Sequence, residues 1–327
     1  MQNLRSLEEV ASDIRALKIQ GARRIARAAL DALAHSAYFS KAHTKNELYH
    51  QLLRDAKLLE STRPTEPMMR NSLDDALRFI LVWIRTHPSE SLSEMKEAIK
   101  EHHTLFLEHM EEAASKISKF GSSEIPAGAN ILIHCHSSTL IGILKKAYDQ
   151  GKNPHVICLE TRPLYQGRLS ARELSEHGIH TSLAVDMSAG SLIGKMDLVL
   201  VGADAISAEG DLINKIGTYS LAQLANIHSV RFLCAAEIYK YDPLTRFGKT
   251  ETIEERNPHE VWGSGRYAQE HYPAGEGANI HPPRHLKILN PAFDRTPAKF
   301  ISAYITEEGL VPPAQLALIA ERKLTQK

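Results

Sequence analysis

The sequence has no excess of either charge, few cysteines and no long hydrophobic run. Its 327 residues include 39 lysine and arginine residues and 39 aspartate and glutamate residues, so its formal net charge is zero. A chain that binds nucleic acid or an anionic membrane surface by electrostatics usually carries an excess of positive charge. We therefore expect neither nucleic acid nor a membrane as a partner.

The lack of long apolar runs and of cysteine pairs indicates the cellular compartment. The longest apolar run, Phe79 to Ile84, is too short to cross a bilayer, and residues 1–10 lack the apolar segment of a signal peptide. The three cysteines, Cys135, Cys158 and Cys234, have no Cys-x-x-Cys spacing, which argues against a disulfide framework. We expect a soluble globular protein of the cytoplasm.

The first part of the chain has the apolar spacing of helices. From Asn71 apolar residues recur with a period of 3.6, and the dipeptide at 87–88 ends the run. A longer helix begins at Ser91, where Glu94 completes a capping box, and we expect Gly121 to end it. The first twenty residues and residues 25–33 also have helical spacing. These patterns predict an all-helical N-terminal domain over residues 1–122.

After residue 125 short β-branched runs alternate with helical segments. This alternation favours a parallel sheet with right-handed crossovers. We therefore predict an α/β fold, with a Rossmann-like parallel-sheet domain over residues 123–327. The expected strands cover 130–133, 156–159, 181–185, 198–201 and 231–234, and the expected helices cover 139–148, 171–177 and 218–228. Residues 254–283, rich in glycine, proline and histidine, should form a long surface loop.

Cys135 directly follows the first predicted strand, and ligands of open α/β sheets bind beyond such strand ends. Ser137 and Ser138 are good N-cap residues, so a helix should begin after the cysteine and lower the pKa of its thiol. The alternative is a small buried hydrophobe, as free cysteine usually is. His134 and His136 should project to the opposite face of an extended strand, so we expect no metal site.

Asp204 follows the fourth predicted strand, in the sequence Gly-Ala-Asp. A carboxyl group in such apolar surroundings should have a raised pKa and act as an acid near neutral pH. The alternative is an aspartate that caps the turn after the strand. Further on, Asn214 and Lys215 lead through Gly217 into the next predicted helix. The helix N-terminus and Lys215 together make a candidate anion site.

Several motifs in this order resemble one superfamily, which contains the sugar-1-phosphate aldose–ketose isomerases and the regulatory subunits of the exchange factor for translation initiation factor 2. Within it the chain looks most like the archaeal ribose-1,5-bisphosphate isomerases, with similarity from about Ile19 to Pro312. The motifs are Glu160-Thr161-Arg162-Pro163, Gln166-Gly167, Gly202-Ala203-Asp204, Asn214-Lys215-Ile216-Gly217-Thr218, Ala236-Glu237-Ile238-Tyr239-Lys240 and Asn290-Pro291-Ala292-Phe293-Asp294.

The resemblance implies a role for each matching residue. Cys135 matches the catalytic cysteine and Asp204 the catalytic aspartate. The matching substrate-binding positions are Gln20, Gly21, Ala22, Arg23, Arg63, Ser137, Ser138, Thr139, Asn214, Lys215 and Lys240. The Arg-Gly-Ala-Gly loop of the family falls on residues 20–23, where Gln20 replaces the arginine and Arg23 the last glycine. Ser138 stands where the family often has lysine. Arg23 is our candidate for the cation lost at Gln20.

The activity that the resemblance implies is conversion of ribose 1,5-bisphosphate to ribulose 1,5-bisphosphate, in the salvage of nucleoside phosphates such as AMP, with no cofactor. Protonated Asp204 would donate to the ring oxygen, and the thiolate of Cys135 would take the proton from C2. A hydride shift is the alternative mechanism. The family also implies dimers that assemble into hexamers, so we expect a homo-oligomer.

Two other functions stay open at this point. A methylthioribose-1-phosphate isomerase should have an apolar pocket for the methylthio group and usually has Ala-Ala-Pro after the fifth strand. This chain has Ala-Ala-Glu there, and Lys240 nearby suits a second phosphate. A regulatory subunit of the initiation factor 2B type would bind a sugar phosphate or nucleotide and a protein partner, but it need not keep Cys135 and Asp204. We favour the bisphosphate isomerase.

Overall fold

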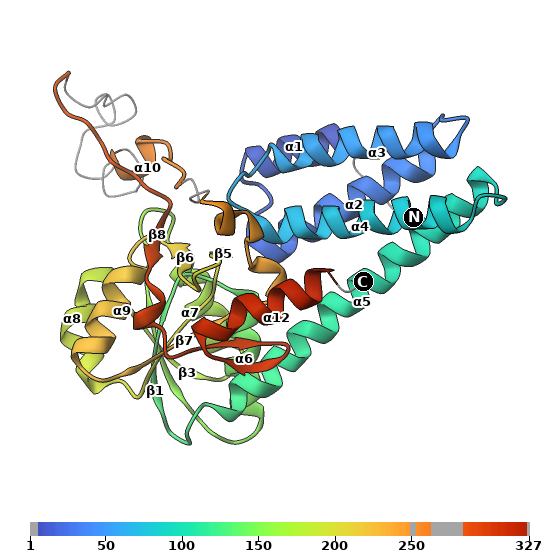
Figure 1. Cartoon of the computed structure of the whole chain (residues 1–327). Coiled ribbons are helices and arrows are strands. Elements are labelled where there is room, and N and C mark those ends of the chain that lie inside the picture. The colour runs from blue at the N-terminus through green and yellow to red at the C-terminus, as the bar shows by residue number, and fades with distance from the viewer. Residues whose placement is uncertain (1–5, 249–252, 263–283, 326–327) are drawn as a thin grey trace.

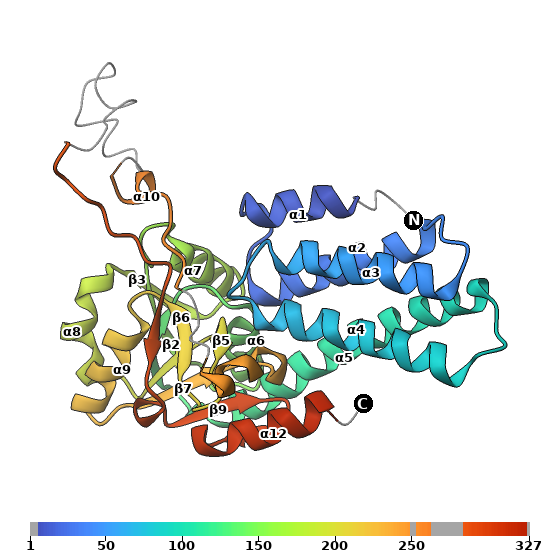
Figure 2. The same cartoon turned by 45° about the horizontal axis from the view of Figure 1, so that its top comes forward.

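The structure is a computed structural model that describes residues 6–248, 253–262 and 284–325. Five helices come first; Figures 1 and 2 show the first four gathered at one side of the molecule, while the fifth extends from them to the sheet. They are α1 (Leu7–Arg15), α2 (Ala22–Phe39), α3 (Lys45–Glu60), α4 (Pro67–Thr86) and α5 (Leu92–Ser123). Ser91 and Glu94 form the expected capping box at the start of α5. Helix α3 lies in a stretch for which we predict no element from the sequence.

The five helices share one apolar core, because each contributes side chains from a single face. Leu33 of α2, Leu52 of α3, Leu73 of α4 and Met95 of α5 are all buried in it. Burying each such side chain contributes about 1.5–3 kcal/mol. None of the helices in the described residues is both long and apolar enough to span a bilayer.

The described residues after α5 form the predicted α/β fold around a seven-stranded sheet in the order β10-β9-β7-β4-β1-β2-β3. All neighbours in this sheet pair in parallel except β9 and β10. The strands are β1 (Asn130–His134), β2 (His155–Leu159), β3 (His180–Ala184), β4 (Leu198–Val201), β7 (Arg231–Ala235), β9 (Ala303–Thr306) and β10 (Gly309–Val311). The five predicted strands are confirmed to within one residue at each end.

The sequence predicts only part of the elements around this sheet. The predicted helices correspond to α6 (Ser138–Asp149), α7 (Gln166–Glu176) and α9 (Thr218–Ile227). The sequence gives no expectation for β9, β10, α12 (Pro313–Thr325) or a small antiparallel sheet of β5 (Ala205–Ile206), β6 (Leu212–Lys215) and β8 (Phe293–Thr296). The loop expected over 254–283 includes α10 (His259–Trp262), and its residues 263–283 lie outside the described residues.

The strand order places a crevice beside β1. The chain runs from β1 outward through β2 and β3, and then returns to the other side of β1 as β4. Such a reversal separates the loops that follow the two central strands and is the usual ligand site of an open α/β sheet. The segments after β1 and β4 carry Cys135 and Asp204, so the topology brings these two residues to one place.

Helix α5 belongs to both parts of the molecule, as Figure 1 shows. Its residue Ile117 lies in the core under the sheet, whereas Met95 lies in the core of the helical part. Gly121 does not end the helix as we predict from the sequence, because α5 crosses α6 closely at this point. A Cβ atom on Gly121 would lie 2.5 Å from Cδ1 of Ile143. The domain boundary near 122 stays a prediction.

Candidate functional site

A cavity of about 420 Å³ lies between the helical part and the ends of β1, β4 and β6. That volume suits a small ligand. All thirteen residues that the sequence analysis selects for the site line this cavity, so the structure brings together segments that are up to 220 residues apart in the chain. They are Gln20, Gly21, Ala22, Arg23, Arg63, Cys135, Ser137, Ser138, Thr139, Asp204, Asn214, Lys215 and Lys240.

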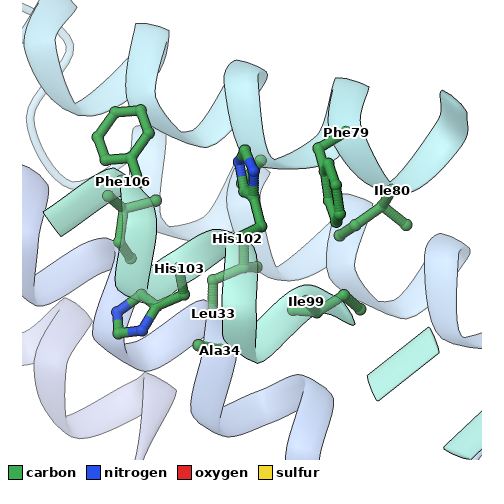
Figure 3. A pocket seen from close by; sticks show the side chains of 10 residues that line it. Leu33, Ala34, Phe79, Ile80, Ile99, His102, His103 and Phe106 are labelled. Atoms are coloured by element: carbon green, nitrogen blue, oxygen red, sulfur yellow. The ribbon is translucent and has the colours of Figure 1, made fainter. Parts of the chain in front are cut away.

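A second cavity lies inside the helical part and is shown in Figure 3. Its volume is about 20 Å³, which is room for one water molecule. The rings of Phe79 and His102 stack at its wall, with centroids 4.1 Å apart. His102 pairs with Asp75 at 3.1 Å, and His103 pairs with Asp31 at 2.8 Å. This cavity is a gap in side-chain packing and is too small for a substrate.

Cys135 leaves the direction of β1 sharply. Its φ is +66°, in the left-handed region that non-glycine residues rarely adopt. Two hydrogen bonds hold it there: its backbone N–H donates to Thr161 Oγ1 at 2.9 Å, and its carbonyl accepts from Ser170 Oγ at 2.9 Å. The expectation that His134 and His136 project away from Cys135 is wrong, because it assumes an extended strand. All three residues line the cavity.

The expected lowering of the Cys135 pKa is also wrong. Burial raises the pKa of this thiol to about 11, with Lys215 lowering it and Asp204 raising it further. Helix α6 does begin beside the cysteine, as predicted, and Ser137 caps it by accepting from the N–H of Leu140. The loss of hydration outweighs the helix terminus. The thiol therefore carries its proton at neutral pH.

Asp204 has the raised pKa that the sequence predicts, with burial as the main cause. Lys215, Lys240 and Arg63 oppose the shift. The backbone N–H of Asp204 donates to the carbonyl of Ile213, which fixes the turn after β4. Its carboxyl group makes no hydrogen bond to the described part of the chain. Asp204 is therefore an acid that is free to act on a ligand.

Three buried cations line the cavity, and they differ in their partners. Lys240 pairs with Glu237 at 3.2 Å, and Glu237 also accepts from Thr139 Oγ1. Arg63 pairs with Glu254 at 3.0 Å. Lys215 makes no ion pair with any described residue and lies 7% exposed. Lys215 is therefore the cation most available to an anionic ligand.

The helix start after Lys215 is not the anion site that we predict from the sequence. Asp294 accepts from the backbone N–H of Gly217 at 2.7 Å and from that of Tyr219 at 3.1 Å. A carboxylate of the chain thus occupies the amide groups that an anion would need. Lys215 itself still faces the cavity.

The two arginines in the first turn of α2, Arg23 and Arg24, have different partners from those that we expect. Arg23 donates to the carbonyl of Met110 at 3.0 Å and pairs with Glu111 at 2.8 Å, so its guanidinium is held against α5. Arg24 is exposed, lines the cavity and makes no hydrogen bond or ion pair with the described residues. Arg24 therefore replaces Arg23 as our candidate for the cation lost at Gln20.

Two glycines of the recognised motifs allow close approaches at the site. A Cβ atom on Gly167 would lie 1.7 Å from the carbonyl oxygen of Leu159, so only glycine lets α7 begin against the end of β2. A Cβ atom on Gly202 would lie 2.8 Å from Cβ of Ser137. This second contact joins the segments that carry Asp204 and Cys135.

Sequence reasoning missed Glu66, which lines the cavity and is 2% exposed. It occupies the N-cap position of α4, directly before Pro67, and its side chain makes no capping hydrogen bond. A glutamate before a proline is the signal in the sequence, since proline favours the first turn of a helix and glutamate is not a usual N-cap.

Comparisons with known proteins place the chain in one family. The model of the initiation factor 2 subunit family matches residues 18–313. The chain is 39% identical to a ribose 1,5-bisphosphate isomerase from Methanocaldococcus jannaschii, over 98% of this chain and 96% of that protein. It is 37% identical to a methylthioribose-1-phosphate isomerase from Pelotomaculum thermopropionicum, over 93% of this chain and 82% of that protein.

A solved structure has the same fold. The translation initiation factor eIF-2B of Pyrococcus horikoshii superposes with a TM-score of 0.76 at 26% identity, covering 94% of this chain and 98% of that one. The family model, the relatives and the solved structure each match most of the chain. The chain belongs to the initiation factor 2 subunit family, and within that family it is an isomerase.

Proposed function

We propose that this isomerase converts ribose 1,5-bisphosphate to ribulose 1,5-bisphosphate. The observation that carries the proposal is one cavity that combines a thiol, a carboxyl group with a raised pKa and buried cations. A sugar bisphosphate matches this set, because its two phosphates need cations and its ring needs an acid and a base. The relatives named ribose 1,5-bisphosphate isomerase support the same substrate.

The reaction needs only proton transfers by Cys135 and Asp204. Cys135 acts as thiolate, its minor form at neutral pH, and removes the proton from C2, whose electron pair forms the C1–C2 double bond. The bond from C1 to the ring oxygen breaks, and Asp204 protonates that oxygen. The enol then loses its C2 hydroxyl proton to the Asp204 carboxylate while the thiol returns a proton to C1. Cys135 and Asp204 thus return to their initial protonation states, and C2 is oxidised while C1 is reduced.

The cations have a different task from the two acid–base groups. Lys215, Lys240 and Arg63 line the cavity with buried side chains, and Arg24 lines it from an exposed position. A buried set of cations and a separate exposed one suit a ligand that carries two phosphates. Holding these phosphates supplies the energy that positions C2 near the thiol. A methylthio group would instead leave buried Lys240 beside an apolar ligand group.

The test is turnover of α-ribose 1,5-bisphosphate followed by ³¹P NMR. We expect the wild-type chain to form ribulose 1,5-bisphosphate, and Cys135→Ser and Asp204→Asn each to lower kcat by about 10²–10⁴-fold. Turnover of methylthioribose 1-phosphate in its place would show the other isomerase activity. Binding without turnover of either sugar would favour a regulatory subunit.

The assembly of this chain into a homo-oligomer and its role in nucleoside phosphate salvage also stay predictions.

A further inference from the structure

We propose that Glu66 is a further substrate-binding residue, which as a neutral carboxyl group hydrogen-bonds a hydroxyl group of the sugar beside Asp204. This inference rests on the proposed function, because it assigns a group on the same ligand. Nothing in the family resemblance or in the motifs points to this residue.

The first observation is an unpartnered atom. Glu66 Oε2 is buried and has no hydrogen-bond partner among the described residues. Its other oxygen, Oε1, lies 3.4 Å from Nη2 of Arg63. Buried polar atoms are nearly always hydrogen-bonded, so an unpaired one that lines a cavity calls for an explanation, and a ligand hydroxyl group would supply the missing partner.

The second observation is the contrast with Glu237, another buried carboxyl group near the cavity. Glu237 accepts from Thr139 Oγ1 and pairs with Lys240, and its pKa is lowered. Its contacts within the chain explain its presence. Oε2 of Glu237 also completes no hydrogen bond among the described residues, but it lies 3.2 Å from Nζ of Lys240. In Glu66 it is Oε1 that approaches Arg63, at 3.4 Å, and the side chain does not cap α4, so its Oε2 lacks an equivalent explanation.

The charges around Glu66 decide which form it takes. Burial and Asp204 raise its pKa to about 8, Arg63 and Lys240 lower it, and Glu254 raises it. At neutral pH the group is mostly protonated and can both donate and accept a hydrogen bond. A sugar hydroxyl also donates and accepts, so the two groups are complementary. An ionised Glu66 would instead place a negative charge beside the carboxyl group of Asp204 and an anionic ligand.

The experiment measures binding of ribose 1,5-bisphosphate by calorimetry at pH 7 and pH 9, in the Cys135→Ser variant to prevent turnover. The neutral fraction of a group with a pKa of about 8 falls about tenfold between these values, so the Kd should rise about tenfold. Adding Glu66→Gln should remove this rise, since an amide stays neutral and keeps a donor and an acceptor. Adding Glu66→Leu should weaken binding by about tenfold or more at pH 7.

Glu60→Gln is the matched control, because Glu60 also has a raised pKa but does not line the cavity. It should leave the pH dependence of the Kd unchanged. The same rise of the Kd between pH 7 and pH 9 with and without Glu66→Gln would overturn the proposal. Thermal unfolding of each variant separates lost binding from lost folding.

Wild-type turnover at pH 7 distinguishes this inference from the proposed function. Pronounced pH dependence of binding that depends on Glu66, without turnover by the wild type, would support Glu66 and overturn the isomerase proposal. Turnover with no effect of Glu66→Gln on the pH dependence would overturn the role of Glu66 alone. Absence of binding to every variant would overturn both.

Discussion

Cys135 combines a partly exposed position with a thiol that is protonated at neutral pH. The sequence predicts its place at the end of a strand and the helix that follows it. It does not predict the direction of the pKa shift, because the burial and the charges of Lys215 and Asp204 come from segments far along the chain. Local sequence sets where the thiol lies, and distant residues set its reactivity.

The reaction of Cys135 with iodoacetamide should therefore depend steeply on pH. We expect the rate to rise about tenfold for each pH unit between 7 and 9, because the thiolate fraction of a group with a pKa near 11 does so. Mass spectrometry of the peptide that contains residue 135 measures the rate. Cys158 and Cys234 are buried and serve as internal controls. A plateau below pH 8 would contradict the raised pKa.

Lys215→Met tests the cause of that reactivity. Lys215 is the main charge that lowers the pKa of Cys135, so its removal should slow alkylation at pH 8 by about threefold to tenfold. Lys195→Met is a suitable control, since Lys195 is exposed and does not line the cavity. Equal rates in the wild type and Lys215→Met would show that this lysine does not act on the thiol.

Among the elements, those with a regular apolar pattern were predictable and those defined by tertiary contacts were not. The four predicted strands at the centre of the sheet are buried runs of apolar residues, as a parallel sheet requires. In contrast, β5 and β6 are short and pair antiparallel, and β8 joins them from residues 293–296. The sequence misleads at Gly121, because the close contact of this residue with Ile143 cannot be seen in a local pattern.

Because Asp294 caps α9, its titration should make the free energy of unfolding depend on pH. Burial raises the pKa of Asp294 to about 6, whereas an unfolded aspartate titrates near 3.8. Between these values the folded chain binds more protons than the unfolded chain, so this group lowers the free energy of unfolding as pH rises. Its contribution at pH 7 is smaller than at pH 4 by about 1–3 kcal/mol.

Asp294→Asn keeps an oxygen that accepts from the N–H groups but removes the titration. Urea unfolding at pH 4.5 and 6.5 should show a smaller fall in stability for this variant than for the wild type. Asp197→Asn is a comparison at another aspartate that accepts from a backbone N–H, at Asn130, and does not cap α9. The same pH dependence in the wild type and Asp294→Asn would contradict the raised pKa.

At the scale of the whole molecule, Asn71 joins the helical part to the loop that holds Lys240. Its Nδ2 donates to the carbonyl of Tyr239 at 2.8 Å and to that of Tyr241 at 2.7 Å, on either side of the lysine. The sequence could not predict this contact, because the two segments are 168 or more residues apart.

Asn71→Ala should both destabilise the chain and weaken substrate binding. It leaves two carbonyl groups without their donor, which costs about 1–3 kcal/mol in the free energy of unfolding. It also loosens the backbone on both sides of Lys240, so KM should rise more than kcat falls. Urea unfolding and steady-state kinetics measure the two effects. Asn226→Ala, at an exposed position on α9, should change neither.

Helix α5 is a single 32-residue element that is packed into both apolar cores. A helix of this length is about 48 Å long and resists bending. We therefore expect the two parts of the molecule that bound the large cavity to keep a nearly constant spacing. If the walls do not close, a ligand with more closely spaced anionic groups than the natural substrate should bind more weakly, so we expect the cavity to select ligands by their length.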